Sequence, residues 1–128
     1  MSMTQTMLFN STDDQNIDNT DKERGPDHLS FNQNFIFKLA EIINLRYNNP
    51  HEGSYVNDLR KSGLNKIAQK VGEEAVETVI AALNDTEQEF IGETADLIFH
   101  LLVLLREKNV SLQMVADKLL QRHHEYQK

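Results

Sequence analysis

Apolar residues recur at three- or four-residue spacing through most of the chain after residue 30, the pattern of helices that bury one face. Five helices are predicted, over about residues 31–47, 55–61, 64–84 and 85–108 and from Ser111 onward. No segment shows the strict alternation of a half-buried strand. The pattern therefore predicts an all-α protein.

Side chains suited to capping stand at several of the expected helix starts. Ser54 and Ser111 are the expected N-caps of the short helix and of the last helix. Asp85 with Gln88 resembles a capping box for the long helix that follows it. In the last helix the apolar side chains expected to face inward are Leu112, Val115, Leu119 and Leu120.

The two long helices are joined by only a short connection around Asn84 and Asp85, so we expect an antiparallel hairpin with its apolar stripes together. Between Leu97 and Leu105 the second of them is apolar almost all round, which favours a homodimer that covers it. The predicted architecture is a helical bundle built on this hairpin and completed by homodimerisation. The predicted stripes are Leu64, Ile67, Ala68, Val71, Ala75, Val79, Ala82 and Leu83 on the first helix, and Phe90, Thr94, Leu97, Leu101 and Leu104 on the second.

Residues 1–30 differ from the rest, with six acidic and two basic side chains and few apolar ones. Such a segment buries too little surface to fold, so it is predicted to be a disordered acidic tail before a folded domain at 31–128. It lacks the basic and apolar regions of a secretory signal, which makes the cytoplasm the expected location. The apolar run at 97–105 is about half of the roughly 20 residues that a membrane span needs, so no membrane partner is expected.

Charge and composition exclude several kinds of chemistry. A net charge of −7 repels a phosphate backbone, so nucleic acid is not an expected partner. The chain has no cysteine, which excludes disulfides, thiolate metal sites and a cysteine nucleophile. Histidines and carboxylates remain as metal ligands.

The carboxylates of the two long helices form two acidic ridges. Counted from the turn between the helices, Glu77 lies at about the depth of Glu93, and Glu74 at about the depth of Asp96. Four carboxylates so placed repel one another and call for a cation. The first ridge holds Lys66, Lys70, Glu73, Glu74 and Glu77, and the second holds Glu89, Glu93, Asp96 and His100.

Ligands that are all oxygen favour Mg²⁺, with Mn²⁺ as the alternative, and Mg²⁺ in proteins commonly also binds substrate phosphates. Lys66 and Lys70 precede the carboxylates on the same ridge and suit such phosphates. His100 is expected to hydrogen-bond Asp96 four residues earlier rather than to bind metal. Spacing alone leaves open that both ridges are ordinary solvated helix faces.

The spacing of Glu73-Glu74-x-x-Glu77 and Glu93-x-x-Asp96 resembles the signature of the all-α nucleoside-triphosphate pyrophosphatases, the MazG and dUTPase-like group. The surrounding residues narrow the resemblance to the phosphoribosyl-ATP pyrophosphatases of histidine biosynthesis, over about residues 31–128. These are Gly53-Ser54-Tyr55, the run from Ile67 to Glu77, Ala95-Asp96-Leu97 and the run from His100 to Leu105.

The resemblance implies hydrolysis of 1-(5-phosphoribosyl)-ATP, a small nucleotide, to the monophosphate and pyrophosphate. It also implies a homodimer and, since no second catalytic domain fits in this length, the free-standing form of the enzyme. The implied Mg²⁺ ligands are Glu74, Glu77, Glu93 and Asp96, with Glu73 as a further ligand or base; Lys70 and Lys66 would hold phosphates, and Ser54 and Tyr55 would line the substrate pocket.

Two positions depart from the family pattern, since Val56 replaces the common Thr and Phe99 the common Tyr, and each removes one hydroxyl. Two rival hypotheses remain. One is a house-cleaning pyrophosphatase for noncanonical nucleoside triphosphates that uses the same carboxylates. The other is a non-catalytic acidic helical interaction module, which predicts no Mg²⁺ dependence.

Overall fold

The protein is seen here as a computed structural model that describes the backbone of residues 26–127 and the side chains of residues 34–127. Over that range the chain forms helices and no strand, as predicted. The first helix begins at Pro26, inside the segment expected to be a tail; residues 1–25 of that predicted tail lie outside the described residues. The helices are α3 (Pro26–Asn48), α4 (Tyr55–Ser62), α5 (Leu64–Asn84), α6 (Glu87–Glu107) and α7 (Leu112–Tyr126).

Two of the three predicted N-caps are confirmed. The Ser54 side chain accepts a hydrogen bond from the Asn57 amide at 3.4 Å, and Ser111 accepts one from the Met114 amide at 3.1 Å. The cap predicted at Asp85 and Gln88 is wrong by one residue.

The start of α6 is instead capped by Thr86 and Glu89. Thr86 Oγ1 accepts from the Glu89 amide at 3.3 Å, and Glu89 Oε2 accepts from the Thr86 amide at 3.4 Å, which completes a capping box. Asp85 serves as the C-cap of α5, where its amide donates to the Ala81 carbonyl at 3.1 Å. The turn therefore ends one helix before it begins the next.

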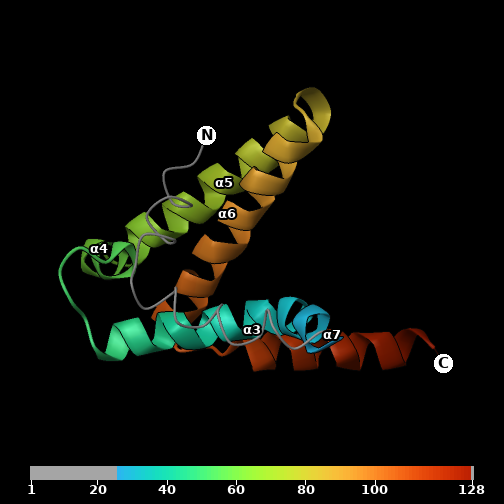
Figure 1. Ribbon diagram of the computed structural model, residues 1–128, viewed down its shortest axis with the longest axis horizontal. Coiled ribbons are helices and arrows are strands. Elements are labelled where there is room, and N and C mark those ends of the chain that lie inside the picture. Colours follow the sequence, from blue (N-terminus) through green and yellow to red (C-terminus); the bar gives the residue numbers. More distant parts are fainter. Residues whose placement is uncertain (1–25, 128) are drawn as a thin grey trace.

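Helices α5 and α6 form the predicted antiparallel hairpin, which rises as an arm away from α3 (Figure 1). The core lies at the base of the arm, where α3 and α4 pack against it. Fully buried side chains there include Ile43, Val56, Ile67 and Val103. This base fixes how both helices of the arm are rotated about their axes.

The faces that meet inside the hairpin differ from the prediction. Glu74 is buried and Thr78 half-buried against α6, whereas Val79 and Leu83 of the predicted stripe are 59% and 76% exposed. On α6, Asp96 and His100 are buried. Glu74 of the first ridge and Asp96 and His100 of the second thus turn inward, because packing at the base of the arm turns Ile67 inward and carries the residues one and two turns later with it.

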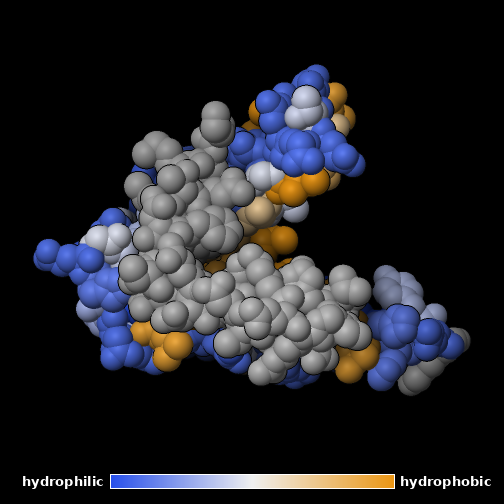
Figure 2. Space-filling model, viewed as in Figure 1, coloured by the Kyte–Doolittle hydropathy of each residue, from blue (hydrophilic) through white to orange (hydrophobic). Residues whose placement is uncertain are grey.

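Much apolar surface of this chain remains exposed as a result. Figure 2 shows orange surface along the inner side of the arm, the side toward α3. The prediction that the apolar side chains of the last helix face inward is also wrong for the single chain. Val115, Leu119 and Leu120 of α7 are 36%, 60% and 54% exposed. Only Leu112 at its start packs against the core, because the rest of α7 runs beyond the other core elements.

No helix within residues 26–127 is both long and apolar enough to cross a membrane.

Candidate metal and nucleotide site

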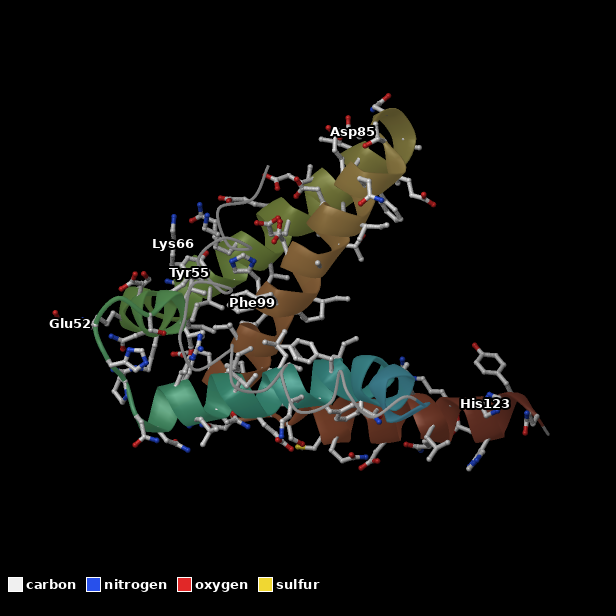
Figure 3. All side chains as sticks on the ribbon, in the orientation of Figure 1. Glu52, Tyr55, Lys66, Asp85, Phe99 and His123 are labelled. Carbon is white, nitrogen blue, oxygen red and sulfur yellow. The ribbon has the colours of Figure 1, made fainter. Side chains whose placement is uncertain are left out.

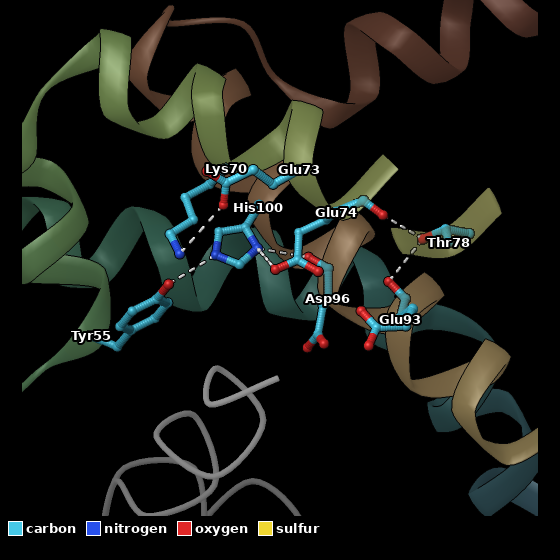
Figure 4. Close-up of polar contacts among 8 residues, drawn as sticks. All are labelled: Tyr55, Lys70, Glu73, Glu74, Thr78, Glu93, Asp96 and His100. Atoms are coloured by element: carbon cyan, nitrogen blue, oxygen red, sulfur yellow. Dashed lines mark hydrogen bonds and ion pairs between the residues drawn. The ribbon is translucent and has the colours of Figure 1, made fainter. Parts of the chain in front are cut away.

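Three carboxylates from the two helices of the arm converge at one depth. One oxygen each from Glu74, Glu77 and Glu93 lie within 4.8 Å of one another. The Thr78 hydroxyl contacts the main-chain oxygens of Glu74 at 2.7 Å and Glu93 at 3.2 Å, so it ties α5 to α6 beside the carboxylates (Figure 4). We call Glu74, Glu77 and Glu93 the acidic cluster.

Two members of the acidic cluster, Glu74 and Glu93, hold protons more tightly than ordinary carboxylates do. Burial, a hydrogen bond with Glu77 and neighbouring negative charges raise the pKa of Glu74 from 4.5 to about 8. Burial and Glu77 also raise the pKa of Glu93. The Oε2 atom of Glu74 is buried and has no hydrogen-bond partner among the described residues. A cation would supply the missing partner and displace the protons.

Asp96 lies beside the acidic cluster rather than in it. Its side chain is buried, and its charge contributes to the raised pKa values of Glu74 and Glu93. The carboxylate is not among the three that approach within 4.8 Å. The structure therefore joins three of the four predicted ligands directly and places the fourth nearby.

Glu73 and the lysines lie on the solvent side of α5. Glu73 accepts a hydrogen bond from Gln69 Nε2 at 2.7 Å and lies 3.9 Å from Lys70 Nζ, and these contacts lower its pKa. Lys66 is exposed and extends from the first turns of α5 (Figure 3). Glu73 is thus separate from the acidic cluster and pairs with Lys70 instead.

Tyr55 and His100 form a second polar unit beside Glu74. The Tyr55 hydroxyl is 2.9 Å from His100 Nε2, and His100 Nδ1 is 2.9 Å from the Asp96 carbonyl and 3.8 Å from Glu74 Oε1. His100 is fully buried, and burial lowers the pKa of its ring. Ser54, which was expected to line the substrate pocket, is buried, and its side chain caps the start of α4.

The two departures from the family pattern fall in the core. Val56 is 0% and Phe99 is 2% exposed, so a hydroxyl at either position would be buried rather than directed into solvent. The Phe99 ring stacks on Tyr55 at 5.9 Å and meets His100 edge-on at 5.3 Å. Phe99 therefore supports the tyrosine and histidine by packing.

Thr78 and the bond from Tyr55 to His100 are the features that sequence reasoning missed. A threonine inside a helix has no distinctive pattern, and Tyr55 and His100 are 45 residues apart. The available signal was that Thr78 follows Glu74 by one turn, which places both on one face.

The phosphoribosyl-ATP pyrophosphohydrolase family matches residues 37–123, which span the acidic cluster, the lysines, Tyr55 and His100. The chain belongs to this family. The phosphoribosyl-ATP pyrophosphatase of Listeria monocytogenes is 56% identical over 84 residues, which are 66% of this chain and 81% of that protein. The phosphoribosyl-ATP pyrophosphatase of Erythrobacter litoralis is 52% identical over 86 residues, 67% of this chain and 83% of that protein.

Some members of the phosphoribosyl-ATP pyrophosphohydrolase family are longer, bifunctional proteins. The histidine biosynthesis bifunctional protein HisIE of Buchnera aphidicola is 50% identical over 92 residues, which cover 72% of this chain and 43% of that protein. The chain spans less than half the length of such bifunctional relatives.

Proposed function

We propose that this protein hydrolyses 1-(5-phosphoribosyl)-ATP to 1-(5-phosphoribosyl)-AMP and pyrophosphate, the second step of histidine biosynthesis, with Mg²⁺. The observation that carries the proposal is the acidic cluster between α5 and α6 in a chain of the phosphoribosyl-ATP pyrophosphohydrolase family. The phosphoribosyl-ATP pyrophosphatases of Listeria monocytogenes and Erythrobacter litoralis also support the proposal, because this chain matches each of them over about four-fifths of its length.

The residues present fit a hard divalent cation. The acidic cluster offers oxygen ligands within 4.8 Å of one another, and Oε2 of Glu74 is buried without a hydrogen-bond partner among the described residues. Oxygen donors of this kind favour Mg²⁺, with Mn²⁺ as the alternative. Glu74, Glu77 and Glu93 would hold the ion, with Asp96 beside them. When bound, the ion would lower the pKa of a water molecule and neutralise charge on the α- and β-phosphates.

The remaining residues bind and orient the substrate. Lys70 and Lys66 lie on α5 before the carboxylates, where their ammonium groups can pair with phosphate oxygens. Glu73 pairs with Lys70, and its lowered pKa makes it a weak base at neutral pH. Water attacks the α-phosphorus, the bond to the bridging oxygen breaks and pyrophosphate leaves, so the protein needs no covalent nucleophile.

We also propose that the protein is a homodimer, whose partner covers the apolar surface left by one chain. Helix α5 exposes Val76 and Val79 at 59% each, Ile80 at 50% and Leu83 at 76%. An apolar stripe along two turns of a helix marks a contact surface. A cytoplasmic location is proposed because the substrate derives from ATP.

The experiment measures pyrophosphate release by purified protein from phosphoribosyl-ATP, dUTP, dCTP and ATP, with Mg²⁺ and with EDTA. Release from phosphoribosyl-ATP alone, abolished by EDTA, is the expected result. Release mainly from the nucleoside triphosphates would instead make the protein a house-cleaning pyrophosphatase. No release from any substrate would return it to a non-catalytic helical module.

A further inference from the structure

Thr78 stands on the inward face of α5, at a position where packed helices usually place an apolar side chain. The residues of this face follow one another at alternating steps of four and three, the spacing of a packed helix seam. They are Ile67, Val71, Glu74, Thr78 and Ala81, each buried or half-buried. Valine has nearly the shape of threonine and would fill the same space. Because burying a hydroxyl costs free energy unless it is hydrogen-bonded, the bonds that Thr78 makes are informative.

The Thr78 hydroxyl joins the two helices that carry the acidic cluster. Its oxygen lies 2.7 Å from the main-chain oxygen of Glu74 in α5 and 3.2 Å from that of Glu93 in α6 (Figure 4). Carbonyl oxygens only accept, so the single hydroxyl hydrogen is shared between them. The two residues held in this way are also members of the acidic cluster. The contact therefore fixes how closely α5 and α6 approach at the level where their carboxylates meet.

Loss of this hydroxyl would let the two helices move apart at the same level. A methyl group in its place cannot donate to either carbonyl, and carbon approaches such an oxygen only to about 3.3–3.6 Å. A wider spacing changes which cation fits between the carboxylates. Mg²⁺ requires oxygen ligands at about 2.0–2.1 Å in nearly octahedral geometry, whereas Ca²⁺ accepts about 2.3–2.6 Å and a flexible arrangement.

We propose that Thr78 is a positioning residue that sets the spacing of the acidic cluster for Mg²⁺ in preference to Ca²⁺. It acts through the main-chain oxygens of Glu74 and Glu93 and needs no contact with the ion or the substrate. The inference rests on the proposed function for the metal site, but not for the identity of the nucleotide. It predicts that removing the hydroxyl weakens the binding of a small cation more than that of a large one.

The test measures cation binding by the substrate-free protein. Free Mn²⁺ is followed by electron paramagnetic resonance, with Mg²⁺ and Ca²⁺ as competitors, at a temperature where circular dichroism shows every variant to be folded. Thr78→Val should bind Mn²⁺ and Mg²⁺ about 2- to 12-fold more weakly than wild type, the range that corresponds to one hydrogen bond. The affinity for Ca²⁺ should fall less, so the ratio of Ca²⁺ to Mg²⁺ affinity rises. Equal losses for both ions, or no loss, would overturn the inference.

Two further variants separate this role from a general effect on stability. Thr78→Ser keeps the hydroxyl and should keep the wild-type ratio of Ca²⁺ to Mg²⁺ affinity, even if loss of the methyl group lowers the melting temperature. Thr94→Val is the matched control, because the Thr94 hydroxyl contacts the Phe90 carbonyl of its own helix at 2.7 Å, one residue after Glu93. It should also keep the wild-type ratio. A ratio changed as much in either variant as in Thr78→Val would contradict the positioning role.

The outcomes distinguish this inference from the proposed function. If the wild type binds neither Mn²⁺ nor Mg²⁺, the metal site and the role of Thr78 are both overturned. If the wild type binds Mg²⁺ and Thr78→Val has the same ratio of affinities, only the role of Thr78 is overturned. A ratio that shifts in Thr78→Val alone supports the role of Thr78, whichever nucleotide the protein hydrolyses.

Discussion

Replacing Glu77 by Gln should stabilise the metal-free protein while it weakens the metal site. Glu77 repels Glu74 and Glu93, whose carboxylate oxygens lie within 4.8 Å of its own. At that distance two unit charges repel by about 3.5 kcal/mol at an effective dielectric constant of about 20, and by about 0.9 kcal/mol in water. Glu77 is exposed and Glu74 is partly protonated near pH 8, so values toward the lower limit apply.

We therefore expect Glu77→Gln to raise the free energy of unfolding by about 1–2 kcal/mol at pH 8, low salt and no divalent cation. For a folded part of this size the melting temperature should rise by roughly 4–15 °C. Thermal unfolding followed by circular dichroism measures this, at one protein concentration because dimers melt in a concentration-dependent way.

The matched control is Glu73→Gln, four residues earlier on the same helix. Glu73 is outside the acidic cluster and is stabilised by Gln69 and Lys70, so removing its charge should leave the melting temperature unchanged or lower it. With Mg²⁺ present the wild type should gain more stability than Glu77→Gln. An unchanged or lower melting temperature for metal-free Glu77→Gln would refute the repulsion argument.

Three further predictions follow from other contacts. The pKa of Glu74 is about 8 in the folded protein and 4.5 in the unfolded chain, so between these pH values the folded protein holds a proton that the unfolded chain releases. The contribution of Glu74 to the stability of the metal-free protein should therefore be greatest below about pH 4.5 and fall as the pH rises toward 8. Urea unfolding across that range tests the sign, and a rise instead of a fall would contradict it. Val79→Glu should convert the proposed dimer to monomer in light scattering, whereas a wild type that is already monomeric would exclude the dimer. Tyr47→Phe removes a 2.6 Å hydrogen bond to Glu107 and should lower the free energy of unfolding, measured in urea, by about 1–2 kcal/mol. An unchanged free energy of unfolding would contradict this and would mean that solvent replaces the contact.

The sequence predicts the helices well because periodic apolar residues and caps are local signals. The boundaries of α5 agree with the prediction, and Ser54 and Ser111 cap the expected helices. The N-cap of α6 is Thr86 rather than the predicted Asp85, because Asp85 already serves as the C-cap of α5. Two candidate caps in one short turn cannot be distinguished by composition alone.

The rotation of the paired helices could not be predicted from periodicity. The chain has more apolar positions on α5 than one partner helix can cover, and the prediction placed Val79 and Leu83 inside the hairpin. In the structure the buried Glu74 faces α6 and those residues are exposed. The depth of the carboxylates was predictable all the same, because it depends only on distance from the turn. The link from Tyr55 to His100 depends on where α4 packs, which no local pattern specifies.

Binding of Mg²⁺ by the acidic cluster is tested by the rate of pyrophosphate release from phosphoribosyl-ATP during Mg²⁺ titration, for wild type, Glu93→Gln and the exposed control Glu125→Gln. If the acidic cluster binds the ion, Glu93→Gln should lose roughly 10- to 100-fold in activity or Mg²⁺ affinity, by analogy with weakened metal sites, while Glu125→Gln matches wild type. Equal rates and equal Mg²⁺ dependence in all three proteins would contradict the account.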